Sequence, residues 1–294
     1  MLLLCRELSS TGKLTGTSVT PRTPCTPCTP GFYSTKAKNL AMSESRQEAI
    51  RLLGLAADRS HRSSVAYAPA FVRSAAGMPD VIPPTPPLAR LIQGGRGGGT
   101  RLPFYLLLTM IATRSPFDIR NPPTAITLAR TLDLPSSTGP RRITSNMKWL
   151  ADNHFIQLIK RPGLTPSIQL LDPHGSGRPM SDTRGGRYVS FPIGFWSYGW
   201  LLHLSPVAIA VLFALTDLLG GSKVPRYMLR DRRASYELSH DAWTRGRHEL
   251  ERAGLLTVKR VPQGDEYVYT RLRNSYWLDT APLDGPVAGL GKTP

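Results

Sequence analysis

The chain has 294 residues, of which 40% are hydrophobic, enough to form one large core or two small ones. Its 37 Lys and Arg residues against 20 Asp and Glu residues give a formal net charge of +17 and a pI near 10.4. A field of this sign attracts polyanions, so nucleic acid, an anionic membrane and an acidic protein are the candidate partners.

A membrane partner is not favoured by the hydropathy pattern. The longest apolar stretches, LPFYLLLTMIAT and PVAIAVLFALTDLL, are shorter than a bilayer span, and the second contains Asp217. The opening MLLLCRELSS has too short an apolar run for a signal peptide. We therefore expect a cytoplasmic, nucleoid-associated protein that has no membrane partner.

Cysteine usage predicts neither a disulfide framework nor a metal site. Cys5, Cys25 and Cys28 all lie in the first 28 residues. Cys25 and Cys28 have the spacing of half a zinc site, but no second pair follows them. We expect no metal and no cofactor.

Arginine dominates the basic residues, with 29 Arg against 8 Lys. Guanidinium groups suit bidentate contacts to phosphate and guanine. The codon usage of a GC-rich genome is the alternative explanation of this bias.

The N-terminal part is expected to be poorly structured. Residues 1–41 are rich in Ser, Thr and Pro with Glu7 as the single acid, which predicts a disordered leader, either an over-called gene start or a transit-like segment. Residues 42–82 are interpreted as a short helix, Glu44 to Asp58, followed by a loose arm. Prolines from Pro83 to Pro87 stiffen the entry to the first folded domain, and glycines from Gly94 to Gly99 predict a flexible hinge.

Two folded domains are predicted, at residues 83–173 and 188–281, with a Gly-rich linker at 174–187 and a tail at 282–294. In the first, helices are expected over Leu102 to Arg114, from Thr124, and from Pro140 at a first helical turn. In the second, Ser205 and Ser239 are the expected caps of the first and third helices. Two short strands around a Pro- and Gly-containing turn follow each third helix.

The two parts match each other at a constant spacing. Ile143 and Trp243, Leu150 and Leu250, and Leu158 and Val258 are each 100 residues apart, and Pro103 and Pro206 are 103 apart. Two copies are too few for a solenoid, so a tandem domain is expected.

The order of three helices and a two-stranded hairpin resembles the winged-helix variant of the helix-turn-helix. The phrase ELERAGLLTVKR and its echo WLADNHFIQLIKR resemble MarR-like regulators, and the tandem arrangement resembles plasmid replication initiators. The resemblance implies a mainly α fold with small β wings, in two tandem winged-helix domains, that binds DNA.

The third helices predict the residues that would read DNA. At 100° per residue, one face of each helix is apolar and the opposite face is polar and basic, as groove insertion requires. The polar set of the first helix is Arg141, Arg142, Thr144, Ser145 and Lys148, and that of the second is Asp241, Thr244, Arg245, His248 and Arg252. A solvated helix surface with no ligand is the alternative interpretation.

Basic residues outside these helices are expected to contact the DNA backbone. Lys160 and Arg161 lie on the first wing, and Lys259 and Arg260 on the second, which also carries the acidic pair Asp265 and Glu266. A cluster precedes the second reading helix: Arg226, Arg230, Arg232 and Arg233. Between the copies, the aromatic run FPIGFWSYGW is interpreted as core or interface rather than as a base-stacking platform.

No catalytic constellation is evident. The helix beginning His248-Glu249 has Arg252 where a zinc protease has its second histidine, and the run GGRGGGT lacks the lysine of a phosphate loop. We therefore expect a non-enzymatic, double-stranded-DNA-binding protein, active in transcription regulation or in the replication initiation of a plasmid or mobile element. A protein-interaction module with a non-specifically basic surface is the alternative, and a homodimer is left open.

Overall fold

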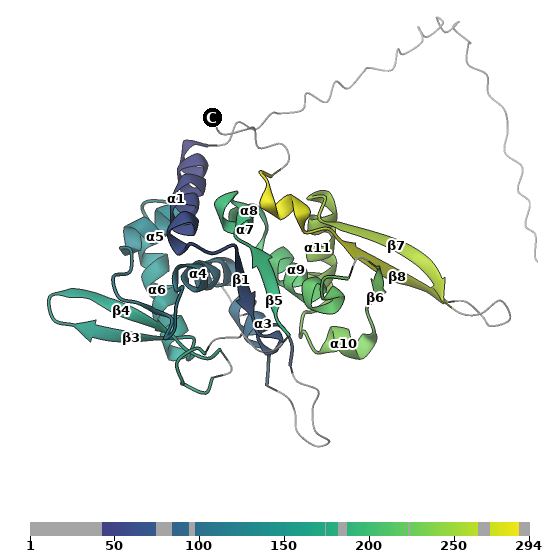
Figure 1. Cartoon of the computed structure of the whole chain (residues 1–294), viewed down its shortest axis with the longest axis horizontal. Coiled ribbons are helices and arrows are strands. Elements are labelled where there is room, and N and C mark those ends of the chain that lie inside the picture. Colours follow the sequence, from purple (N-terminus) through teal and green to yellow (C-terminus); the bar gives the residue numbers. More distant parts are fainter. Residues whose placement is uncertain are drawn as a thin grey trace, which may run out of the picture. The chain divides into compact units, whose positions relative to one another are not determined.

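The structure is a computed structural model that describes residues 43–74, 84–93, 98–173, 175–181, 187–222, 224–263 and 271–287. The predicted leader and the acidic pair Asp265 and Glu266 lie outside the described residues. The described residues belong to one compact unit of mixed helices and small sheets (Figure 1). None of its helices is both long enough and apolar enough to cross a membrane.

The segment before the first copy is more ordered than its sequence predicts. It forms α1 (Glu44–Ser60), β1 (Ser64–Tyr67), α2 (Pro69–Val72) and α3 (Pro87–Ile92). Ser43 caps α1 by accepting from the Arg46 amide. The expected loose arm instead carries β1 and α2, whose Val65, Phe71 and Val72 are buried because they pack against the core.

The first copy consists of α4 (Gly98–Ile111), β2 (Asp118–Ile119), α5 (Ala125–Thr131), α6 (Gly139–Asp152), β3 (Ile156–Arg161) and β4 (Leu164–Leu170). The three helices and the hairpin are where the pattern predicts them, and Thr124 caps α5. The expected glycine hinge is wrong at its C-terminal end, since Gly98 and Gly99 begin α4. A Cβ on Gly98 would lie 2.8 Å from the Ile92 carbonyl oxygen, so only glycine fits there.

The second copy repeats this order. It consists of α9 (Pro206–Leu219), β6 (Arg226–Tyr227), α10 (Arg230–Ala234), α11 (His240–Arg252), β7 (Leu256–Gln263) and β8 (Arg271–Leu278). Ser205 and Ser239 cap α9 and α11 through the amides of Ala208 and Ala242.

Each copy contains a three-stranded antiparallel sheet of the same topology. The strand orders are β2-β4-β3 and β6-β8-β7, so the return strand of the hairpin is central in both. In register, Leu158 faces Ile168 in the first copy and Val258 faces Tyr276 in the second. The short outer strands β2 and β6 were not expected from the sequence, because two residues are too few to show a pattern.

The segment between the copies forms β5 (Val189–Pro192), α7 (Gly194–Ser197) and α8 (Trp200–His203). β5 pairs with β1 in a separate two-stranded sheet, with Val65 opposite Phe191. The aromatic run is core, as expected, since Phe191, Phe195, Trp196 and Trp200 are buried. Part of the predicted linker is also structured: the Met180 amide donates to the Leu170 carbonyl.

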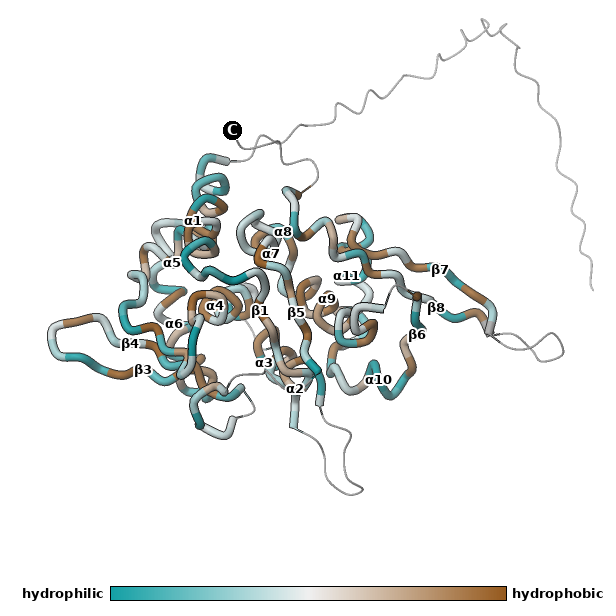
Figure 2. Tube along the Cα trace, viewed as in Figure 1, coloured by the Kyte–Doolittle hydropathy of each residue, from teal (hydrophilic) through white to brown (hydrophobic). Residues whose placement is uncertain are grey.

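One hydrophobic core spans both copies. Its cluster runs from Leu53 of α1 to Val287, and α4 and α9 contribute the longest buried stretches. Figure 2 shows these two hydrophobic helices in the middle of the unit. The helix η2 (Ala281–Asp284) extends into the predicted tail of 282–294, where Leu283 is buried and Trp200 Nε1 donates to the Gly285 carbonyl 2.9 Å away.

Candidate nucleic-acid interface

The outer faces of α6 and α11 are presented by equivalent scaffolds. In α6 the buried side is formed by Ile143, Asn146 and Leu150, and in α11 by Trp243, Gly246 and Leu250. These sets lie 100 residues apart, and the exposure of residues 145–160 repeats that of residues 245–260 position by position. The opposite face of each helix is therefore open to solvent at corresponding places.

On α6, four of the five predicted residues lie on the open face. Arg141, Ser145 and Lys148 are exposed, and Thr144 is exposed while its Oγ1 donates to the Pro140 carbonyl at 3.0 Å. Within the described part of the chain, no acidic side chain pairs with Arg141 or Lys148. Both cations are thus available to an external anion.

Arg142 does not belong to this face. Its side chain is partly buried, and its Nη2 donates to Thr100 Oγ1 of α4 at 2.5 Å. Arg142 is thus turned toward α4, and its predicted contact with DNA stays a prediction.

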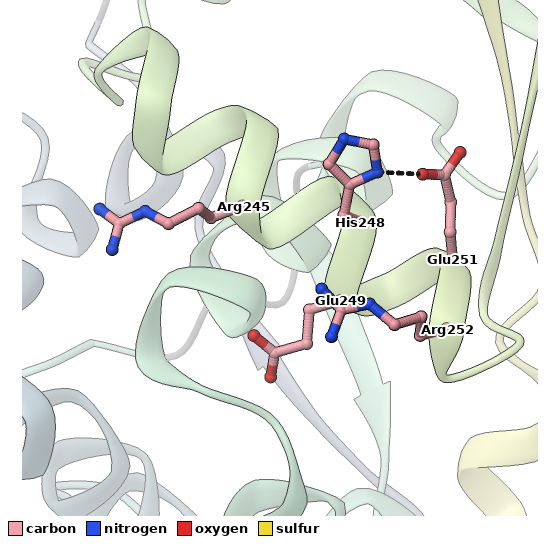
Figure 3. Close-up of a pocket in the computed structure, with 5 residues that line it drawn as sticks. All are labelled: Arg245, His248, Glu249, Glu251 and Arg252. Atoms are coloured by element: carbon pink, nitrogen blue, oxygen red, sulfur yellow. Dashed lines mark hydrogen bonds and ion pairs between the residues drawn. The ribbon is translucent and has the colours of Figure 1, made fainter. Parts of the chain in front are cut away.

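On α11 the open face carries mixed charges. Arg245 and Asp241 form an ion pair of 2.9 Å with side chains 67% and 76% exposed. His248 Nδ1 lies 3.1 Å from Glu251 Oε2, while Arg252 is exposed and Thr244 is only half-buried. Five residues of α11 line a hollow on its surface. Figure 3 shows that Arg245 points away from the other four, while the contact between His248 and Glu251 lies on the opposite side of the helix.

This hollow on α11 is shallow and open, lined by Arg245, His248, Glu249, Glu251 and Arg252. Glu249 is not a free acid in it, since its carboxylate accepts from the amide and hydroxyl of Ser205, both at 2.6 Å. The hollow therefore has mixed charge, since the guanidinium groups of Arg245 and Arg252 lie beside the carboxylates of Glu249 and Glu251.

The hairpins differ in how they hold their basic residues. Lys160, Lys259 and Arg260 are exposed, and Lys259 Nζ lies 5.4 Å from the centre of the Trp277 ring. Arg161 is held by its own hairpin, since its Nη2 donates to the Thr165 carbonyl at 2.8 Å and to Asn121 Oδ1 at 3.3 Å. Arg161 thus stays close to the hairpin backbone.

The arginine cluster around α10 divides into two kinds. Arg226 and Arg230 are exposed, although Arg226 Nη1 donates to the Leu218 carbonyl at 3.3 Å. Arg232 forms a 2.6 Å ion pair with the fully buried Asp217. This ion pair turns Arg232 toward the core, and its predicted contact with phosphate stays a prediction.

Arg233 occupies an intermediate position. Its Nη2 lies 2.8 Å from His240 Nδ1, and its guanidinium carbon lies 5.6 Å from the centre of the Trp243 ring. These contacts place Arg233 beside the start of α11, where a half-exposed cation could meet a phosphate at the edge of the groove.

The described ranges contain no cluster of three or more His, Cys, Asp or Glu side chains placed to hold a metal ion. A second cavity lies elsewhere, lined by β1, the end of α4 and the segment after β4. Sequence reasoning missed this cavity because its walls come from separate segments of the chain. Comparisons with protein-family models, with curated proteins and with solved structures found no match to the chain.

Proposed function

We propose that the chain binds double-stranded DNA through two winged-helix domains, as a transcriptional regulator or as an initiator of plasmid or mobile-element replication. The observation that carries this proposal is the repetition of one open, polar helix face on two equivalent scaffolds in a chain of charge +17. One basic helix face is ordinary for a helix exposed to solvent. Two such faces at equivalent positions of a repeated fold suit two successive major grooves of one DNA duplex.

The topology supports this assignment. In each copy the order is helix, short strand, helix, helix and hairpin, with the short strand added to the edge of the hairpin. This is the arrangement expected of a winged helix, in which the third helix enters the major groove and the hairpin contacts the backbone.

In the proposed complex, α6 and α11 lie in major grooves. Arg141, Lys148 and Arg245 supply cations to phosphates or guanine edges, and Thr144 and Ser145 are short donors for base edges. Lys160, Lys259, Arg260, Arg226 and Arg230 supply the salt-dependent backbone contacts.

The placement of the copies favours one long site with two half-sites. In Figure 1 the hairpins β3–β4 and β7–β8 extend in opposite directions from the central pair α4 and α9. Two reading helices held in one unit would contact successive turns without dimerisation.

The ion pair on α11 does not argue against groove insertion. Arg245 and Asp241 are both mainly exposed, and such surface pairs contribute about 0–1 kcal/mol. A phosphate or base edge can therefore replace Asp241 as the partner of Arg245 at little cost.

A protein-interaction module is the second candidate, favoured by exposed apolar side chains on the hairpins. Leu164 lies four residues before Ile168 of the first hairpin, and Leu272 lies four residues before Tyr276, the corresponding residue of the second hairpin. The two leucines are 63% and 62% exposed. Exposed leucines at equivalent positions suit a protein surface.

The test is selection of DNA from a random-sequence pool with the full chain, followed by binding across a salt series. Lys148→Ala should relax specificity in one half of the selected site and Arg245→Ala in the other, each costing about 1–3 kcal/mol of discrimination. Arg51→Ala is the control, since Arg51 is exposed on α1 and pairs with Glu48.

Failure to enrich a sequence, with steep salt dependence that neither variant changes, would sink the proposal. It would leave a generic cationic surface, and a search for protein partners would be the next step. Enrichment at promoters would favour regulation, and repeated sites at an origin would favour initiation.

A further inference from the structure

The turn of the first hairpin carries an exposed apolar tip. β3 and β4 are joined by Pro162 and Gly163, with Arg161 opposite Leu164 in register. Pro162, Leu164 and Pro166 are all exposed, and we call these three side chains the apolar tip. Figure 1 shows this hairpin extending away from the helices of the first copy, so the tip is open to a large partner.

The turn that presents the apolar tip is rigid. Its proline has a fixed φ, and Gly163 has a φ of +68°, which glycine adopts without strain. Arg161 Nη2 donates to the Thr165 carbonyl at 2.8 Å, and its Nη1 donates to Asn121 Oδ1 at 3.2 Å. The turn is thereby tied to the segment before α5, and a rigid tip loses little conformational entropy on binding.

The charges around the apolar tip suit a polyanion. Residues 155–171, which include the whole hairpin, contain no Asp or Glu. Lys160 is exposed beside Arg161 on the strand that leads to the turn. Cations next to an apolar tip, without competing acids in the same hairpin, complement the phosphates that border a DNA groove.

The small size of the apolar tip favours DNA over a protein partner. A stable protein interface buries about 800 Å² on each side, more than one leucine and two prolines can supply. Proteins that bind the minor groove, in contrast, insert single apolar side chains between base pairs, and Leu and Pro are among the residues used.

The length of the hairpin fits this placement. The six residues of β3 span roughly 20 Å at about 3.3 Å per residue. Half a helical turn of DNA, the spacing from a major groove to the next minor groove, is about 17 Å. A hairpin that starts beside α6 in a major groove can therefore reach the neighbouring minor groove.

We infer that Leu164 enters the minor groove next to the major groove occupied by α6, inserts between two base pairs and bends the duplex. Lys160 then lies near the bordering phosphates. This inference rests on the proposed DNA binding and adds a distortion of the DNA to it. Leu272 has the corresponding place on the second hairpin, but residues 264–270 lie outside the described residues, so the inference concerns Leu164 alone.

The test compares the full chain on two short DNA duplexes of one sequence, of which one carries two extra unpaired adenines in one strand. The bulge already bends the duplex and opens its base stack, so a protein that inserts a side chain should prefer it. We expect fluorescence anisotropy to show about tenfold tighter binding to the bulged duplex. A donor and an acceptor dye at the two ends of the straight duplex should show increased energy transfer on binding.

Leu164→Ala should lose both the preference for the bulged duplex and the increase in energy transfer. Leu164→Lys should lose them too while it keeps or raises the affinity for the straight duplex, because it replaces the inserted side chain by a cation. Both variants should fold, since Leu164 is 63% exposed. The matched control is Leu55→Ala, at a leucine of α1 that is 41% exposed, and it should behave as the unaltered chain.

Three results would overturn the inference while the proposed DNA binding stands. The chain could bind both duplexes equally, bind the straight duplex without a change in energy transfer, or keep both effects in Leu164→Ala. The last result, together with unchanged DNA affinity, is the one expected if Leu164 contacts a protein. Failure to bind either duplex would overturn the proposed function as well.

Discussion

Asp217 shows how a single side chain decides the role of its neighbours. Its side chain is fully buried in α9, and its Oδ2 accepts from Arg73 Nε at 3.0 Å, Arg232 Nη2 at 2.6 Å and the Tyr236 hydroxyl at 2.9 Å. These donors come from the arm, from α10 and from the turn after it. One buried carboxylate therefore joins three segments and turns the Arg232 guanidinium toward the core.

Replacing Asp217 by Ala should lower the free energy of unfolding by about 3 kcal/mol, because two arginines lose the charge that compensates their partial burial. Chemical denaturation monitored by circular dichroism measures the change. Asp231→Asn is the control, an exposed acid on α10 for which we expect a change below about 1 kcal/mol. Equal effects of the two substitutions would contradict the role of Asp217.

Arg230 and Arg232 should separate DNA binding from stability. Arg230 is exposed, so Arg230→Ala should weaken DNA binding on all sequences and reduce the salt slope by about 1 without changing the unfolding midpoint. Arg232→Ala should lower the midpoint instead. Fluorescence anisotropy across a salt series and thermal unfolding of both variants give the comparison, and loss of stability in Arg230→Ala would refute it.

Helix α11 packs on α9 through a glycine. Gly246 is buried, and a Cβ there would lie 2.7 Å from Val211 Cγ2 and 3.0 Å from the Val207 carbonyl oxygen. The equivalent residue of the first copy is Asn146, whose Nδ2 donates to the Arg142 carbonyl of its own helix at 2.8 Å. The repeated helices thus bury equivalent positions with different side chains.

Gly246→Ala should destabilise the protein by about 1–3 kcal/mol through overpacking, although alanine is the better helix former. Gly99→Ala in α4 is the matched control: a Cβ there meets nothing within 4 Å, so the helix gains up to about 1 kcal/mol. Thermal unfolding of both variants tests the close approach of α11 to α9. A stabilised Gly246→Ala protein would show that this approach relaxes easily.

The two copies and the arm share a single hydrophobic core. Core residues of α1, of both copies and of the C-terminal η2 belong to one cluster, and β1 of the arm pairs with β5 between the copies. Arg46 of α1 also pairs with Asp133 of the first copy at 3.2 Å. The relative placement of α6 and α11 is thereby built into the chain.

A single unfolding transition is expected from this shared core. Leu150 and Leu250 are fully buried at equivalent positions, and each change to Ala should cost about 2–5 kcal/mol and shift the whole transition. Differential scanning calorimetry distinguishes the outcomes. Two transitions, of which each variant moves one, would show that the copies unfold as separate domains.

Local sequence signals predicted much of the repeated fold. The caps Ser205 and Ser239 and the apolar periodicity located most of the long helices, because both signals act within one or two turns. The outward positions of Arg141, Lys148 and Arg245 were predicted by the same periodicity. The strands β1, β2 and β5 were not, since short strands depend on partners distant in the chain.

The sequence alone was sufficient for the charge, the duplicated order of elements and the polar faces of the third helices. The fold in three dimensions settled which cations are free, since ion pairs such as Arg232 with Asp217 and contacts such as Arg142 with Thr100 join separate elements. It also created the second cavity and the core shared by both copies. Packing and pairing depend on distances between side chains, and spacing along a chain does not specify those distances.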